Sequence, residues 1–168
     1  MNKYRTSWRR VLAGLIDGLV FFPTAFLSDY LFSPQRSAPV LIIWGVTYYS
    51  AMWLYGVVLH ALYGKTIGKM VMRIKVLDIS EERIPSLPQA FVRDIVYIFI
   101  NVLSLVYFVY LVLTGEYVIG AVEKNIPGQI IAWAALAWFV LEILSMITNK
   151  KRRAVHDYIA GTVVVKDI

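Results

Sequence analysis

Four long apolar segments constrain this chain more than any other feature of its sequence. They cover about residues 11–32, 40–62, 95–113 and 130–148. A helix needs about 20 mostly apolar residues to cross the ~30 Å hydrocarbon core of a bilayer, and each segment is long enough to do so. The sequence therefore predicts an all-α membrane protein, with four transmembrane helices in a single domain over residues 1–168.

The composition excludes the main alternatives to a membrane protein. Hydrophobic residues make up 59% of the chain and charged residues 17%, whereas soluble domains have about 45–50% and about 25%. So much apolar surface also excludes a disordered chain. The absence of cysteine excludes a small secreted domain held by disulfides.

The lysines and arginines are distributed unevenly along the chain. Fifteen of the seventeen lie in the N-terminal segment, in the connection between the second and third apolar segments, or in the C-terminal tail. Short loops rich in Lys and Arg stay on the cytoplasmic side of a membrane. We therefore expect both termini in the cytoplasm. Because orientation explains the net charge of +6, we expect no nucleic-acid partner.

Two short segments outside the apolar stretches have the pattern of β-strands. Residues 72–76 alternate apolar and basic side chains, and residues 162–166 are rich in β-branched valine after Gly161. We expect the two segments to pair as a small cytoplasmic ribbon that ties the loop to the tail.

The first part of the loop between the second and third apolar segments carries two glycines and two lysines. Its order, Gly64-Lys-Thr-Ile-Gly-Lys, differs from that of a nucleotide-binding P-loop, so a nucleotide site is not expected. Lys65 and Lys69 are instead predicted to face the membrane surface, where each contact with anionic lipid contributes about 1 kcal/mol.

Three polar residues lie at similar depth inside the apolar segments, namely Asp17, Asn101 and Glu142. Charged groups within a span usually face a protein interior, because exposing them to lipid is costly. Two carboxyl groups in one such site could bind a cation or a proton. Alternatively, each acid makes a permanent ion pair, and Arg10 lies two helical turns before Asp17 on the same face. The sequence leaves both interpretations open.

The chain has no motif that predicts catalysis or a metal site. It has no serine nucleophile elbow and no H-E-x-x-H sequence. Its two histidines lack zinc-ligand spacing. We therefore expect no enzyme activity, no metal and no cofactor.

Four motifs, in order along the chain, resemble those of the RDD family of bacterial membrane proteins. The first has Arg10, Ala13 and Asp17 at the start of the first apolar segment. The others are Gly64-Lys-Thr-Ile-Gly-Lys-Met with Arg73-Ile-Lys-Val, Pro88-Gln-Ala-Phe-Val-Arg93, and Lys151-Arg-Arg-Ala-Val-His-Asp157 with Gly161-Thr-Val-Val-Val. Lys65 departs from the pattern, which has a small or polar neutral residue there.

The resemblance implies a helical protein of the bacterial cytoplasmic (inner) membrane, with Arg10, Asp17 and Asp157 as its principal residues. Transport is commonly suggested for the family, and some members are linked to sodium–proton exchange. If the chain transports, we expect Asp17 to carry a monovalent cation or proton in a homo-oligomer, with Arg10 setting the pKa of Asp17. Glu142 or Asn101 would assist; these two are added from their depth in the bilayer and not from the resemblance. Arg93 and Asp157 would pair near His156. The alternative is a non-transporting scaffold or assembly factor in which these charges form a structural network.

Overall fold

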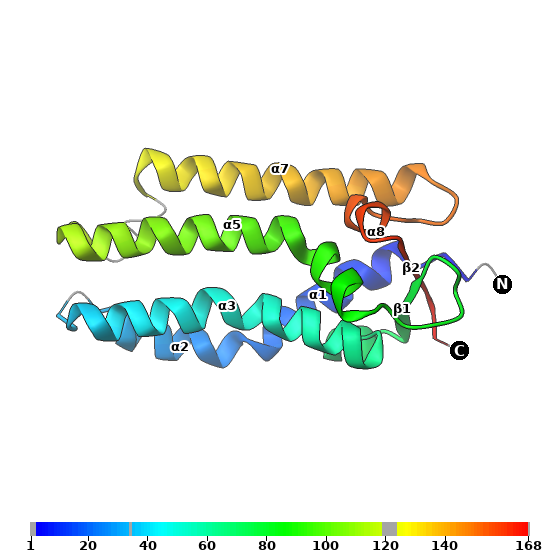
Figure 1. Cartoon of the computed structure of the whole chain (residues 1–168), viewed down its shortest axis with the longest axis horizontal. Coiled ribbons are helices and arrows are strands. Elements are labelled where there is room, and N and C mark those ends of the chain that lie inside the picture. The colour runs from blue at the N-terminus through cyan, green and yellow to red at the C-terminus, as the bar shows by residue number, and fades with distance from the viewer. Residues whose placement is uncertain (1–2, 34, 119–123, 168) are drawn as a thin grey trace. The chain divides into compact units, whose positions relative to one another are not determined.

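The computed structural model describes residues 3–33, 35–118 and 124–167 of the chain. Within these residues, five helices lie wholly or partly in the apolar segments, and two short helices and two strands lie outside them. Figure 1 shows these elements along the chain. In chain order the elements are α1 (Ser7–Val20), α2 (Phe22–Leu31), α3 (Ala38–Tyr63), α4 (Ile67–Val71), β1 (Ile74–Asp78), α5 (Leu87–Thr114), α7 (Ile126–Thr148), α8 (Val155–Ile159) and β2 (Thr162–Lys166).

Three of these helices, α3, α5 and α7, are long and apolar enough to cross a membrane. The predicted first span is two helices, α1 and α2, which give a fourth span only when they are counted together. The break falls at Phe21, because Pro23 stands at the start of α2, where its missing N–H and fixed φ suit a helix N-terminus. Helix α5 begins at Leu87 rather than near Ile95, so Arg93 belongs to the helix.

The chain divides into two compact units. The first comprises residues 1–20, 54–95 and 138–168, and the second comprises residues 21–53 and 96–137. Helices α3, α5 and α7 each contribute one end to each unit. The residues of the buried charge network and of the Asp17 site described below belong to the first unit, whereas Asn101 belongs to the second.

The first unit contains the predicted ribbon, which is therefore confirmed. Strands β1 and β2 pair antiparallel, with Ile74 opposite Lys166 and Asp78 opposite Thr162, and they lie side by side in Figure 1. The first strand begins two residues later than predicted, at Ile74, after Arg73 adopts a positive φ of 51°. Side chains of both strands form a small buried cluster with α1, composed of Ala13, Ile74, Val76 and Val164.

The two ends of the described chain lie together in this unit. The backbone N–H of Lys166 donates to the carbonyl of Lys3 over 3.0 Å, which extends the pairing beyond β2. Lys3 also forms an ion pair with Glu81, in the turn after β1, at 2.5 Å. The N-terminal segment, the loop after β1 and the C-terminal tail therefore form one structure.

The second unit has an aromatic core. Phe108 of α5 is buried with Leu41 and Val112, and its ring meets those of Phe32 and Tyr117 edge to face, with centroids 5.3 and 5.2 Å away. Such edge-to-face pairs stabilise a core beyond the area they bury.

Candidate functional site

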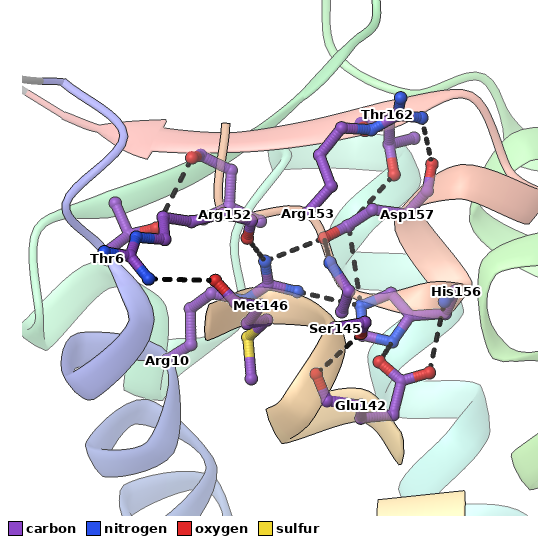
Figure 2. Close-up of polar contacts among 12 residues, drawn as sticks. Thr6, Arg10, Glu142, Ser145, Met146, Arg152, Arg153, His156, Asp157 and Thr162 are labelled. Atoms are coloured by element: carbon purple, nitrogen blue, oxygen red, sulfur yellow. Dashed lines mark hydrogen bonds and ion pairs between the residues drawn. The ribbon is translucent and has the colours of Figure 1, made fainter. Parts of the chain in front are cut away.

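The carboxylate of Asp157 is the centre of a buried charge network in the first unit. It is fully buried and lies between two guanidinium groups: Arg10 Nη1 is 2.7 Å from Oδ2, and Arg93 Nη1 is 2.6 Å from Oδ1. Figure 2 shows Arg10 and His156 converging on this carboxylate. Because Arg10 belongs to α1, Arg93 to α5 and Asp157 to α8, one carboxylate joins three helices that are distant in sequence. We refer to Arg10, Arg93, Asp157, His156 and Glu142 as the clamp.

Local structure fixes Asp157 in this position. Its Oδ2 accepts a hydrogen bond from the backbone N–H of Ala154, at the start of α8, over 2.9 Å. The hydroxyl of Thr162, at the start of β2, donates to Oδ1 over 3.2 Å. Gly161 connects α8 to β2 with a φ of +62°, which favours glycine. Residues 154–162 of the tail thus supply two of the hydrogen bonds that hold the carboxylate in place.

The electrostatics of the clamp hold Asp157 in its charged form. Burial alone would raise the pKa of this carboxyl group, but the positive charges of Arg10 and Arg93 outweigh burial and bring the pKa well below its ordinary value. A buried carboxylate with two guanidinium partners and further donors is a fixed anion at physiological pH.

His156 and Glu142 complete the clamp. Nδ1 of His156 lies 2.5 Å from Oε2 of Glu142, and the backbone N–H of His156 donates to the other carboxylate oxygen over 3.1 Å. On the other side of the ring, Nε2 faces Nη2 of Arg10 at 3.0 Å and Nη2 of Arg93 at 2.8 Å. Guanidinium groups only donate, so Nε2 accepts and the ring proton resides on Nδ1, toward Glu142.

The pKa of His156 agrees with this neutral tautomer. Burial lowers it below its ordinary value, and the charge of Arg93 lowers it further. With a neutral histidine, the two arginines and the two carboxylates of the clamp balance in charge. The predicted pairing of Arg93 with Asp157 is therefore present, within a network that is larger than expected.

Arg10 does not approach Asp17, contrary to the prediction. Its guanidinium bonds Asp157, His156 and the carbonyl of Arg152, the last over 3.0 Å. Side chains on a helix tilt toward its N-terminus, and Arg10 precedes Asp17, so the arginine extends away from the acid.

Asp17 instead has three partners of its own, all at 2.7 Å. The Tyr55 hydroxyl and the Gly68 backbone N–H donate to Oδ1, and the Thr66 hydroxyl donates to Oδ2. Thr66 and Gly68 stand at the start of α4, and Tyr55 belongs to α3. The carboxylate therefore caps α4, where a negative charge is favoured, and joins it to α1 and α3.

The glycine at position 68 is required by how closely α1 and α4 approach. A Cβ at this position would lie 2.0 Å from the carbonyl oxygen of Ala13 and 2.9 Å from Cγ of Asp17. The small residues Ala13 and Gly68 therefore bring the backbones into contact, which lets the Gly68 N–H reach the acid. This geometry gives Ala13, Asp17 and Gly68 of the two sequence motifs a shared structural role.

The two lysines predicted to face lipid have protein partners. Lys65 forms an ion pair with Asp167 in the tail. Lys69 is half-buried, with Nζ 3.4 Å from the Thr66 hydroxyl. Burial, and then the charge of Arg93, lowers its pKa to about 8, against the opposing effects of Asp17 and Asp94.

The three polar residues predicted at similar depth have separate surroundings. Glu142 is part of the clamp, and Asp17 caps α4. Asn101 lies in the second unit, where its side-chain amide donates to the carbonyl of Tyr97 over 2.8 Å. Within residues 3–33, 35–118 and 124–167, no three His, Cys, Asp or Glu side chains are grouped so that they could hold a metal ion.

Two polar residues near these groups were not identified from the sequence. Tyr55 donates to Asp17, and Asp94 of α5 has its Oδ2 4.0 Å from Nδ1 of His60. The sequence did not distinguish Tyr55 as a partner of Asp17, since aromatic residues are common near the ends of membrane helices. Asp94 was missed because the third apolar segment was predicted to begin near Ile95, which left Asp94 in a loop. Helix α5 in fact begins at Leu87, so Asp94 is part of the helix and lies near His60.

Comparison with known proteins identifies the family of the chain but no individual relative. Searches of curated proteins and of solved structures found no match. The sequence matches the model of the RDD family over residues 4–161, nearly its whole length. The match includes every residue of the clamp as well as Asp17 and its donors. Together with its apolar helices, this match establishes that the chain belongs to the RDD family of membrane proteins.

Proposed function

We propose that this protein is a non-enzymatic scaffold of the bacterial cytoplasmic membrane, which holds other membrane proteins or further copies of itself. In this proposal α1 and α2 together form the first of four spans, and both termini lie in the cytoplasm. The uneven distribution of cations supports this orientation, with anionic lipid around the basic face. The hydrogen bond between the two ends of the chain agrees with termini on one side.

One observation carries the proposal of a structural role: the acids of the family motif are occupied by fixed donors. Asp17 has three donors at 2.7 Å, and Asp157 has two guanidinium groups within 2.7 Å. A carboxylate that binds a transported cation must release its existing partners. Hydrogen bonds to a charged group contribute about 1.5–3 kcal/mol each, so releasing several of them opposes exchange at these acids.

The helix surfaces support a scaffold that associates within the membrane. Most residues of α3, α5 and α7 are not buried by the rest of the chain, which leaves broad apolar faces for lipid or for other helices. On α7 the small residues Ala132, Ala134, Ala135 and Ala137 allow close helix approach. We propose a homo-oligomer on this basis.

Cation–proton exchange is the second candidate, and the contact between Glu142 and His156 favours it. The carboxylate belongs to a helix of membrane-spanning length and faces a titratable ring at 2.5 Å. A proton could move between them if the clamp opened. In this alternative Glu142 carries the proton, with Asp17 and Asn101 as further polar groups along the path.

A flux assay separates the two candidates. Purified protein in liposomes would be given sodium, potassium or proton gradients, and ion movement recorded with fluorescent indicators. The scaffold predicts rates equal to those of protein-free liposomes, and an Asp17→Asn variant with lower thermal stability. Flux that is lost in Asp17→Asn or Glu142→Gln, and kept in the control Glu116→Gln at an exposed position, would instead establish transport.

A further inference from the structure

One side of the short helix α4 is apolar and exposed, although this helix lies outside the long apolar segments. Ile67, Met70 and Val71 form this side, which we call the outer face, and all three are exposed, Val71 by 61%. Their spacing of three and four residues places them together on the helix surface. The clamp and the Asp17 site use none of these side chains. A group of exposed apolar side chains indicates contact with a membrane or with another protein.

The opposite side of α4 is held against α1, which fixes how the helix is turned. Gly68 lies so close to α1 that a Cβ would come within 2.0 Å of the Ala13 carbonyl oxygen. Its backbone N–H donates to Asp17, and the hydroxyl of Thr66 donates to the same carboxylate, both over 2.7 Å. The outer face therefore cannot turn into the protein without breaking the Asp17 site.

A contact with α3 places the start of α4 beside a membrane span and not beyond its end. The backbone N–H of Ile67 donates to the Tyr55 hydroxyl over 2.9 Å. Tyr55 lies eight residues before the end of α3 at Tyr63, which is about 12 Å along the helix axis at 1.5 Å per residue. Because α3 is long and apolar enough to cross a membrane, the outer face begins at the level of the bilayer.

Two arginines and a tryptophan lie at the other end of α4. Nη1 of Arg9 donates over 2.9 Å to the carbonyl of Met72, the C-cap residue of this helix. The same guanidinium lies 5.3 Å from the centre of the Trp8 ring, and both Trp8 and Arg73 are exposed. We call Trp8, Arg9 and Arg73 the rim. Tryptophan is enriched at the membrane–water interface and cations are attracted to the phosphates there, so the rim is complementary to a lipid surface.

We propose that α4 lies in the interface of the bilayer, with its outer face among the acyl chains and its rim at the phosphates of the lipid headgroups. Asp17 caps α4, so this position also brings its carboxylate near the headgroups and away from the centre of the hydrocarbon core, where a charge is most costly. The interfacial position requires only a chain that spans a membrane, and it does not depend on the scaffold function.

Electron paramagnetic resonance tests this position on the full chain, in nanodiscs of phosphatidylcholine and phosphatidylglycerol. Because the chain has no cysteine, a nitroxide label can be attached to one introduced cysteine at a time. Collisions with oxygen, which concentrates among acyl chains, and with a water-soluble nickel complex together give the depth of the label. In Val71→Cys we expect the label about 5–10 Å below the headgroups. In the control Glu82→Cys, at an exposed position after β1, collisions with the nickel complex should dominate.

A label in Arg73→Cys tests the rim and should lie at a depth between those of positions 71 and 82. All three positions are exposed, so the variants should unfold thermally like the wild type. The interfacial position is wrong if the label at 71 meets the nickel complex as often as the label at 82. It is also wrong if neither reagent reaches position 71, because a second copy of the chain would then cover α4. A label at 73 as deep as that at 71 would contradict the rim. The flux assay leaves these depths unchanged, whichever function it supports.

Discussion

Replacing Asp157 with asparagine is expected to destabilise the protein by about 3–5 kcal/mol, the range for removing one partner of a buried ion pair. The substitution leaves the guanidinium groups of Arg10 and Arg93, both buried, without their shared anion. Asparagine has nearly the same size as aspartate, so the loss of stability measures the effect of removing the charge and not a change in packing. Reversible unfolding in mixed detergent micelles, followed by circular dichroism, would measure it.

The matched control for this variant is Asp167→Asn. Asp167 also pairs with a cation, Lys65, but both side chains are partly exposed. Exposed ion pairs contribute about 0–1 kcal/mol, so this change should be nearly neutral. Equal losses in the two variants would show that burial of the clamp does not matter.

Replacing Gly68 with alanine is the second change with a large expected effect. The added methyl group would meet the Ala13 carbonyl at 2.0 Å, and backbone atoms cannot rotate away as a flexible side chain can. Helices α1 and α4 must separate, which also breaks the hydrogen bond from Gly68 to Asp17. Overpacking costs about 1–3 kcal/mol and loss of a bond to a charged group about 1.5–3 kcal/mol. We expect a total of about 2.5–6 kcal/mol, measured by the same unfolding assay.

Helix α1 offers the matched control, because Gly14 and Gly18 have open space where a Cβ would lie. Alanine at either position should be neutral or stabilise the helix by up to about 1 kcal/mol, as its higher helix propensity predicts. If Gly68→Ala behaves like Gly14→Ala, then α1 and α4 are not in backbone contact.

The secondary structure was largely predictable because it depends on local sequence. Apolar length identified the helices, and β-branched residues after Gly161 identified β2. The predicted ribbon formed because apolar side chains of both strands are buried together against Ala13 of α1. The break between α1 and α2 was missed because the apolar segment continues through Phe21 and Pro23, and hydrophobicity alone does not register a change of helix.

The partners of the charged residues were harder to predict, because they depend on contacts between distant segments. Sequence spacing placed Arg10 near Asp17. In the structure the Arg10 side chain instead extends toward the N-terminus of α1, where it pairs with Asp157. Lys69 was predicted to face lipid, because a lysine in a membrane-proximal loop usually does. In the structure it is partly buried beside Thr66, a position that depends on how α4 packs within the unit and that spacing within the loop cannot indicate.

The central claim is that the clamp holds the C-terminal tail against α1 and α5, and hydrogen exchange of the β2 amides tests it most directly. In the wild-type protein we predict strong protection of residues 162–166, comparable to that of the β1 amides that pair with them. In Asp157→Asn these amides should exchange roughly a hundredfold faster, while those of α3 in the second unit keep their protection. Rapid exchange of β2 in the wild type, or equal rates in the two proteins, would contradict the claim.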